Sequence, residues 1–422
     1  MNGPLNSQLG EGNAKMRVLI STWGSRGDVE PMVGLAIALQ EFGNKVCLFA
    51  PPDQEFKDLL ARFDLPLAPA FSSVRDWLAL AKRTGMALSQ LIPLMVEGQY
   101  NAIAAAAEGC DAIVATGIFP SLAAAQSVAE KFAIPFVSAH FCPRYLPSTH
   151  HAPVEFPGWP HPPEITENRA LWAFNIQAMD AIFGGAVNTH RASIGLGTVE
   201  NIRDHVFSRR PLLAADPVLG PWLPTDLCHA IQTGAWIAPD ARPLGADLEA
   251  FLEMGAPPVY VGFGSMAMKA APDAARTAIE AIRSQRHRIL LARGWAEFAA
   301  IDDQEDCFVI GDVNQQALFG RVAAVVHHGG AGTTTTAARA GAPQLIVPQI
   351  ADQPYWAGRV AGLGIGVAHE GQVPTLESLS AGLRIALASK TREHAIAIAS
   401  TIRTDGTRRA AEVLVSAIRE KR

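Results

Sequence analysis

Short runs of apolar residues alternate along the chain with stretches in which apolar residues recur at helical spacing. Near the N-terminus, a buried-strand pattern over 17–22 leads through a glycine-containing turn to a helix expected over 32–42, opened by Pro31, and then to a strand over 46–50. Strands and helices that alternate in this way build a parallel sheet. Further strands expected over 112–115 and 135–138 extend the pattern. It predicts a doubly wound α/β sheet for the first half of the chain.

The same alternation returns in the second half, after a proline-rich break over 211–236. Apolar strands are expected over 259–265, 288–292 and 307–310, with helical patterns between them. We therefore predict two Rossmann-like domains with doubly wound parallel sheets. Open sheets of this kind bind their ligands at the carboxyl ends of the strands, which places the ligands in a cleft between the domains.

These patterns divide the chain into segments with distinct expected roles. We expect a disordered extension over 1–15, a first domain over 16–215, a linker over 216–236, a second domain over 237–405, and a C-terminal helix over 406–422 that can pack back on the first domain. An irregular segment over 141–169 is rich in proline, histidine and aromatic residues, and such a segment inside a compact domain is typical of a binding loop.

One stretch of the second half predicts an anion site. Residues 325–336 read as a β-branched strand, then glycines, then the start of an alanine-rich helix. Glycines let the backbone approach a ligand, and the first N–H groups of a helix have no partner of their own. His328 stands at the strand exit as a further donor, although a histidine there can also be purely structural. His327 points to the opposite strand face, and we expect it to be structural.

Composition and charge exclude several classes of function. The 422 residues are 49% apolar and carry a net charge of −5, which argues against a nucleic-acid-binding surface. The five cysteines are scattered without C-x-x-C spacing, so no zinc site is indicated, and the carboxylates of the acidic loop over 302–306 give no support for a metal site. No apolar run reaches the ~18–20 residues that span a bilayer. We expect a cytoplasmic monomer that binds no metal ion and does not insert stably into a membrane.

Two nucleotide chemistries are also disfavoured by spacing. Neither the turn over 23–28 nor the turn over 263–266 has the G-x-G-x-x-G order of a dinucleotide fingerprint, and the Walker pattern G-x-x-x-x-G-K-[ST] is absent from the sequence. Hydride transfer and P-loop hydrolysis are therefore not the expected reactions.

Several motifs in order along the chain resemble the family 1 glycosyltransferases of the two-domain GT-B fold. The likeness is strongest to bacterial natural-product enzymes of the glycopeptide-antibiotic type and to sterol glycosyltransferases, and it extends from residue 16 to the end. The motifs are Gly24-Ser25-Arg26-Gly27-Asp28-Val29-Glu30-Pro31, Gly262-Phe263-Gly264-Ser265, Arg293-Gly294-Trp295, Asp306-Cys307-Phe308, His328-x-Gly330-x-Gly332-Thr333, Pro348-x-x-x-Asp352-Gln353 and Gly358-Arg359-Val360-Ala361.

The resemblance implies roles for the matching residues. It implies that Ser265, His328, Gly330, Gly332 and Thr333 hold the donor diphosphate. Asp352 and Gln353 would bind the transferred sugar, with a helix cap as the alternative for Asp352. Trp295 and Val313 would lie near the nucleotide base. The acceptor would contact Arg26, His140, Phe141 and Trp172, although Arg26 can equally be a solvated arginine.

Asp28 is the residue that the resemblance implies as catalytic base. The reaction requires a group that takes a proton from the acceptor hydroxyl as it attacks the anomeric carbon. A carboxylate needs burial to raise its pKa enough for this task. The alternative is that Asp28 caps the helix that begins near Pro31.

Three functions follow as hypotheses. The first is inverting, metal-independent transfer of a hexosyl group from a UDP- or dTDP-sugar, used as co-substrate with no further cofactor, to a hydroxyl of a bulky hydrophobic aglycone. The second is a nucleotide-sugar epimerase of the same fold. The third is a non-catalytic partner of another transferase, which retention of Asp28, His328 and Asp352 disfavours.

Overall fold

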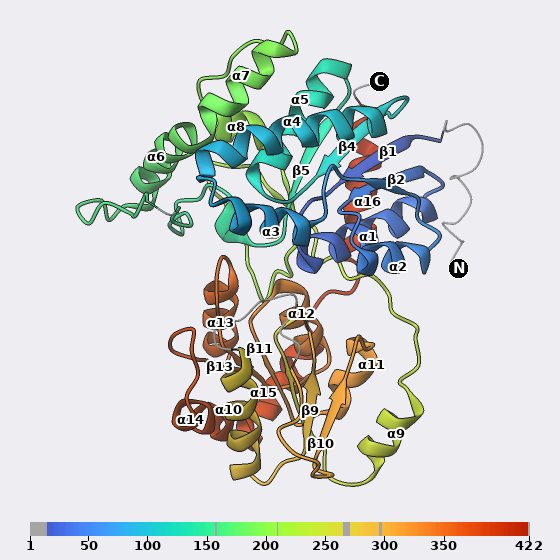
Figure 1. Ribbon diagram of the computed structural model, residues 1–422, viewed down its shortest axis with the longest axis vertical. Helices are drawn as coiled ribbons and strands as arrows, with labels where there is room; N and C mark the ends of the chain where they lie inside the picture. The colour runs from blue at the N-terminus through green and yellow to red at the C-terminus, as the bar shows by residue number, and fades with distance from the viewer. Residues whose placement is uncertain (1–14, 157, 209, 265–270, 295–297, 421–422) are drawn as a thin grey trace, which may run out of the picture.

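The computed structural model describes residues 15–156, 158–208, 210–264, 271–294 and 298–420. The described chain forms two lobes, each built on a twisted parallel sheet with helices on both faces, which confirms the predicted α/β class (Figure 1). The C-terminal helix returns to the lobe that holds the first strands, so both ends of the described chain lie in the same lobe.

Among the described residues, the first sheet has seven strands in the order β3-β2-β1-β4-β5-β6-β7. The order reverses between β1 and β4, which pair in parallel with each other, so the carboxyl ends of these two strands frame a ligand-binding crevice. The strands are β1 (Arg17–Ser21), β2 (Lys45–Ala50), β3 (Leu67–Pro69), β4 (Ala112–Ala115), β5 (Phe136–His140), β6 (Leu212–Leu213) and β7 (Ile231–Gln232).

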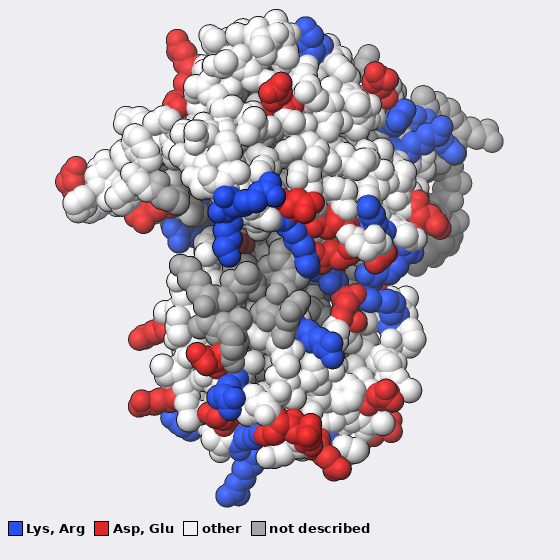
Figure 2. Space-filling view, in the orientation of Figure 1, with Lys and Arg blue, Asp and Glu red and all other residues white. Residues whose placement is uncertain are grey.

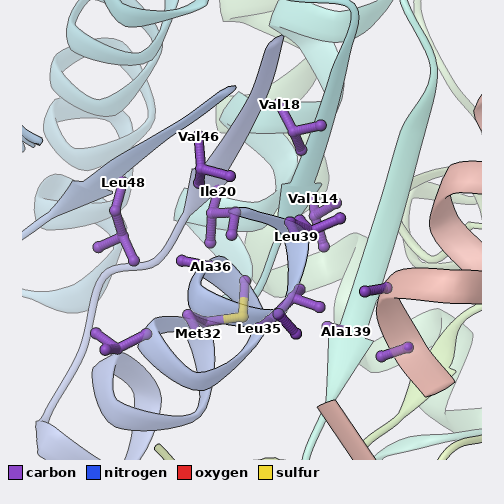
Figure 3. Close-up of a cluster of buried hydrophobic side chains, with 14 of the residues drawn as sticks. Val18, Ile20, Met32, Leu35, Ala36, Leu39, Val46, Leu48, Val114 and Ala139 are labelled. Atoms are coloured by element: carbon purple, nitrogen blue, oxygen red, sulfur yellow. The ribbon is translucent and has the colours of Figure 1, made fainter. Parts of the chain in front are cut away.

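Two groups of helices cover this sheet. On one face, α1 (Arg26–Glu41), α2 (Gln54–Ala61) and α16 (Gly406–Arg419) bury apolar side chains against β1, β2 and β4. Figure 3 shows Met32, Leu35 and Leu39 of α1 among the strand residues Ile20 and Val46. The helices whose side chains pack on the other face are α3 (Val74–Thr84), α4 (Leu88–Ala107), α5 (Phe119–Phe132), α6 (Asn168–Met179), α7 (Gly185–Ser193) and α8 (Ile202–Val206).

The second sheet repeats this arrangement. Its six described strands lie in the order β10-β9-β8-β11-β12-β13, so the reversal falls between β8 and β11. The strands are β8 (Val259–Gly262), β9 (Ile289–Ala292), β10 (Cys307–Ile310), β11 (Ala324–His327), β12 (Gln344–Ile346) and β13 (Gly366–Ala368). The helices are α9 (Ala246–Glu253), α10 (Ala271–Ser284), α11 (Gln315–Leu318), α12 (Ala331–Arg339), α13 (Gln353–Gly362), α14 (Leu376–Ala386) and α15 (Ser389–Ala399).

An apolar cluster joins the two lobes. Cys142 and Leu219 of the first lobe and its connection pack with Trp356 and Val360 of α13. The indole of Trp356 lies so close to Gly220 that a β-carbon there would stand 2.9 Å from it. Arg359 adds hydrogen bonds to the Leu219 and Val218 carbonyls, at 2.7 and 3.0 Å. The lobes therefore meet through a packed contact on the α13 side.

The structure corrects two expectations. The segment 216–236 is not only a linker, because β7 pairs with β6 and so belongs to the first sheet; its two-residue strand is too short to show an apolar alternation. Helix α1 begins at Arg26 and contains Pro31, six residues into the helix. The expected position of Pro31 was the start of the helix, where a missing N–H costs nothing.

The C-terminal helix lies on the first lobe. Ala410, Leu414 and Ile418 of α16 are buried in the same cluster as α1. No helix in the described parts of the chain has both the length and the apolar character needed to cross a membrane.

Candidate active site

A cavity of about 480 Å³ lies at the carboxyl ends of β1, β4 and β5 in the first lobe. It adjoins the point where the strand order reverses, which is where open α/β sheets bind ligands. The lining is mainly apolar and aromatic and includes Leu91, Met95, Phe119, Phe156, Met179 and Phe183. Such a surface suits a bulky apolar ligand.

Asp28 reaches this cavity from the first turn of α1. Ser25 is the N-cap residue, and its backbone N–H donates to Asp28 Oδ2 at 2.8 Å, so the carboxylate closes a capping box and also lines the cavity. The pKa of Asp28 is raised to about 6, chiefly by burial; the hydrogen bonds from Ser25 lower it and the charge of Asp352 raises it. A carboxylate with such a pKa can accept a proton near neutral pH.

Asp352 faces Asp28 from the other lobe. It is the N-cap residue of α13, but its side chain does not cap the helix; instead Trp356 Nε1 donates to Asp352 Oδ2 at 2.7 Å. Burial raises the pKa of Asp352. The phenol of Tyr145 interacts with Asp352. Burial is the main cause that raises the pKa of this phenol, and the negative charges of Asp352 and Asp28 raise it further. The charge of Asp352 thus acts on Asp28 across the junction of the lobes.

The side-chain carbonyl of Gln353 holds a turn of its own backbone. Its Oε1 accepts hydrogen bonds from the backbone N–H groups of Gln349 (2.7 Å) and Ile350 (3.1 Å). These bonds brace a turn in which Ala351 adopts a φ of 59°. Because the carbonyl is occupied, a sugar hydroxyl would be bound by the carboxamide nitrogen.

The glycine-rich turn joins β11 to α12, as predicted. Gly330 is the N-cap residue, and the first helical bond runs from Thr334 N to Gly330 O at 2.9 Å. The amides of Ala331, Gly332 and Thr333 therefore precede the first helical bond, and such groups are free to bind an anion. Space around Gly332 is open, since a β-carbon there would meet nothing within 4 Å.

The ring of His328 lies between two glycines. A β-carbon at Gly330 would stand 2.7 Å from His328 Nε2, and one at Gly264 would stand 3.1 Å from Cε1. Burial lowers the pKa of His328 to about 4, so the ring is neutral at pH 7. Within the described residues its Nδ1 is buried without a hydrogen-bond partner. The ring atom nearest the helix start is Nε2, beside Gly330, whereas the unpartnered Nδ1 is buried.

His327 has the structural position that strand alternation predicts. Its Nδ1 accepts from Gly329 N (3.1 Å), so the proton is on Nε2, which donates to Gln344 Oε1 at 2.9 Å. The residue is fully buried, and burial lowers its pKa to about 3.

Three of the four predicted acceptor residues line the cavity, namely His140, Phe141 and Trp172. His140 is buried near Ser138 Oγ (3.3 Å), and burial lowers its pKa to about 3. Arg26 does not line it. Because α1 starts at Arg26, the guanidinium stands one turn before Glu30 and pairs with it, and it also contacts Asp312 of the second lobe at 2.7 Å.

Asp312 is an interdomain charge that the sequence did not reveal. It contacts Arg26 and, more distantly, Arg62 of the first lobe (3.5 Å), and Arg242 at 2.7 Å. Figure 2 shows basic and acidic side chains gathered where the two lobes meet on this face. Val313, predicted near the nucleotide base, follows Asp312 and is partly buried against the cluster that includes Phe319. Ser265 and Trp295 lie outside the described residues.

Arg144, Tyr145 and Arg203 also line the cavity and were not predicted. The first two fall in the irregular segment that we expected to be a binding loop, but nothing in its sequence distinguishes them from their neighbours. In the described parts of the chain, no cluster of three or more His, Cys, Asp or Glu side chains is arranged to hold a metal ion.

Comparison with known proteins identifies the family. Residues 18–150 match the Glycosyltransferase family 28 N-terminal domain, and residues 305–413 match the Erythromycin biosynthesis protein CIII-like C-terminal domain. Glycosyltransferase GtfE of Amycolatopsis orientalis is 52% identical over 96% of this chain and 99% of its own length. Vancomycin aglycone glucosyltransferase of the same organism is 50% identical over 96% and 99%.

Solved structures agree on the fold. The glycosyltransferase of kitacinnamycin superposes with a TM-score of 0.71 at 19% identity and covers 95% of this chain and 98% of its own. Glycosyltransferase VinC, solved in complex with dTDP, gives a TM-score of 0.66 at 19% identity over 96% and 100%. At this identity the likeness concerns the fold. Together with the full-length relatives, it places this chain among the GT-B glycosyltransferases, within the group that includes GtfE and vancomycin aglycone glucosyltransferase.

Proposed function

We propose that the protein transfers a hexosyl group from a UDP- or dTDP-sugar, with inversion and without a metal ion, to a hydroxyl of a bulky hydrophobic natural-product aglycone. The observation that carries the proposal is the position of Asp28: a carboxylate whose pKa is raised to about 6 lines a large apolar cavity and faces Asp352 of the other lobe. The similarity to vancomycin aglycone glucosyltransferase supports the proposal that the acceptor is a bulky aglycone.

In the proposed reaction, the acceptor hydroxyl oxygen attacks the anomeric carbon while Asp28 takes its proton. The bond between that carbon and the donor diphosphate breaks in the same displacement, so the new bond forms on the opposite face and the configuration inverts. A positioned base contributes ~10²–10⁴-fold to such a step.

The departing diphosphate would be stabilised by the start of α12. The amides of Gly332 and Thr333 precede the first helical bond, and a helix N-terminus favours negative charge. His328, neutral because burial lowers its pKa to about 4, would donate one hydrogen bond. Preorganised donors of this kind act without a metal ion. Asp352 and the carboxamide nitrogen of Gln353 would contact the sugar hydroxyls.

A grid of sugar nucleotides against hydrophobic aglycones, read by mass spectrometry, tests the proposal. We expect a product heavier than the aglycone by one hexosyl group, and its loss in Asp28→Asn with nucleotide affinity retained. Unchanged turnover in this variant would show that Asp28 is not the base. Incubation with the sugar nucleotide alone is the control for the epimerase hypothesis, because an epimer formed without an acceptor contradicts transfer as the activity.

A further inference from the structure

We propose that the acceptor carries a carboxylate, and that Arg144 binds it inside the cavity of the first lobe. This inference rests on the proposed function, because it names the chemical class of the aglycone that the same cavity accepts. The observation behind it is a partly buried guanidinium on the cavity wall whose hydrogen-bonding capacity is largely unused.

Three charged residues of the described chain line the cavity, namely Asp28, Arg144 and Arg203, and two of them form short hydrogen bonds or ion pairs within the protein. Asp28 accepts from Ser25 N at 2.8 Å. Arg203 pairs with Asp204 at 2.8 Å, and its Nη1 donates to the Trp172 carbonyl at 2.8 Å. Arg144, unlike Arg203, has no ion-pair partner among the described residues.

The contacts of Arg144 are few and long. Its Nη2 donates to the carbonyls of Ala152 (3.4 Å) and Pro153 (3.3 Å), both near the upper limit for a hydrogen bond. Its Nε is buried and has no partner among the described residues. No described carboxylate forms an ion pair with it, whereas several other arginines of the chain do form such pairs.

An anion in the cavity could supply the hydrogen-bond acceptors that Arg144 lacks. Taking a guanidinium out of water without a partner is costly, and an anion that enters the cavity would remove that cost. The planar guanidinium matches a carboxylate in a two-bond geometry. A singly charged group fits better than a phosphate monoester, because Asp28 and Asp352 would repel a second negative charge.

The position of Arg144 also suits a role in orienting the acceptor. Arg144 lies in the 3₁₀ turn Pro143–Tyr145, which follows β5. The next residue, Tyr145, interacts with Asp352. A carboxylate held by Arg144 would therefore lie on the same wall as the Tyr145 ring, while the apolar body of the acceptor packs against the aromatic lining that includes the contacting rings of Phe119 and Phe183.

Calorimetric titration without donor tests the inference independently of turnover. The probes are an N-acylated aromatic tripeptide that ends in a carboxylate and the same peptide ending in a carboxamide. We expect the wild-type protein to bind the acid about tenfold or more tightly, as a hydrogen bond to a charged group implies, and Arg144→Met to remove this preference. Arg144→Lys should restore part of it.

The design separates recognition from folding. A merely structural Arg144 would make the Met variant lose affinity for acid and amide alike, whereas recognition predicts a loss for the acid alone. Arg169→Gln, which breaks an exposed ion pair with Asp226 outside the cavity lining, should keep the preference. Equal binding of the two probes by the wild type, or no saturable binding of the acid, overturns the inference. The transfer assay run in parallel reports separately on the proposed function.

Discussion

The carboxylate of Asp28 lies directly against Gly24. A β-carbon at position 24 would stand 2.1 Å from Asp28 Oδ2, a separation that no side chain tolerates. Gly24 does not have a positive φ, so a glycine is required at this position for space and not for backbone conformation. Gly24 and the N–H of Ser25 together fix the rotamer of Asp28 and aim it at the cavity.

Replacement of Gly24 by Ala should therefore displace the carboxylate. We expect Gly24→Ala to lower kcat/KM by about 10²-fold or more, the range lost when a positioned base is removed. Gly27→Ala is the matched control, since a β-carbon there would meet only Ser25 Oγ, at 3.7 Å. Steady-state kinetics of both variants would settle the point, and equal rates for the two would contradict the role of Gly24.

The activity should depend on pH through Asp28. The base acts in its ionised form, and burial raises its pKa to about 6, so kcat/KM should rise with pH and level off above this value. Asp352 contributes to the raised pKa, hence Asp352→Asn should move the midpoint to lower pH as well as slow the reaction. A pH–rate profile whose midpoint is the same in both proteins would argue against this coupling.

The contribution of Asp28 to stability should fall with rising pH, whereas its contribution to activity rises. The pKa of Asp28 is higher in the folded protein (about 6) than its ordinary value of 3.8, so the folded state binds the proton more tightly. Its contribution to the free energy of unfolding is therefore greatest at low pH and is lost as pH rises from about 4 to about 6. Thermal unfolding of Asp28→Asn should show a smaller loss of Tm across this window than the wild type.

Part of this site was visible in the sequence and part was not. The strand–turn–helix around His328 and the Pro348–Gln353 motif are continuous in the chain, so a local pattern was enough to predict them. The cavity draws Asp28 and Phe119 from the starts of α1 and α5 and Arg144 from the 3₁₀ turn after β5, three separate segments. Which residues of those segments turn inward depends on packing between distant parts of the chain, and no local periodicity records it.

The same distinction explains why the ion pairs of Arg26 were not predicted. From sequence, the turn over 23–28 and Pro31 suggested a later helix start, and the family resemblance separately suggested acceptor contact for Arg26. In the structure Arg26 is the first residue of α1, and its partner Asp312 is 286 positions away. A pairing at that separation has no signature in a single sequence.

Donor affinity should depend on His328 and not on His327. His328 has a buried Nδ1 without a partner in the described chain, while both ring nitrogens of His327 are occupied. We expect His328→Ala to weaken nucleotide diphosphate binding by about tenfold or more, the cost of one hydrogen bond to a charged group. Titration with the diphosphate measures this effect. Because burial keeps the ring neutral, the His328 contribution should be constant between pH 6 and 8.

Movement between the lobes should respond to Asp312. This carboxylate is shared by Arg26, Arg62 and Arg242, and the first two belong to the opposite lobe. Each pair is about one-third exposed, with Asp312 at 39%, so a single one contributes only ~0–1 kcal/mol and Tm should change little in Asp312→Asn. Its loss should instead loosen the side of the junction opposite α13.

We expect Asp312→Asn to have a larger radius of gyration in solution scattering and a higher KM for both substrates, since a cleft that closes less well assembles the site less often. Salt should reproduce the effect in the wild type, because screening shortens the reach of a charge to ~3 Å at about 1 M ionic strength. Asp226→Asn is the control, as it breaks the exposed pair with Arg169. A radius of gyration that is the same in Asp312→Asn and in this control would show that apolar packing at α13 alone holds the lobes.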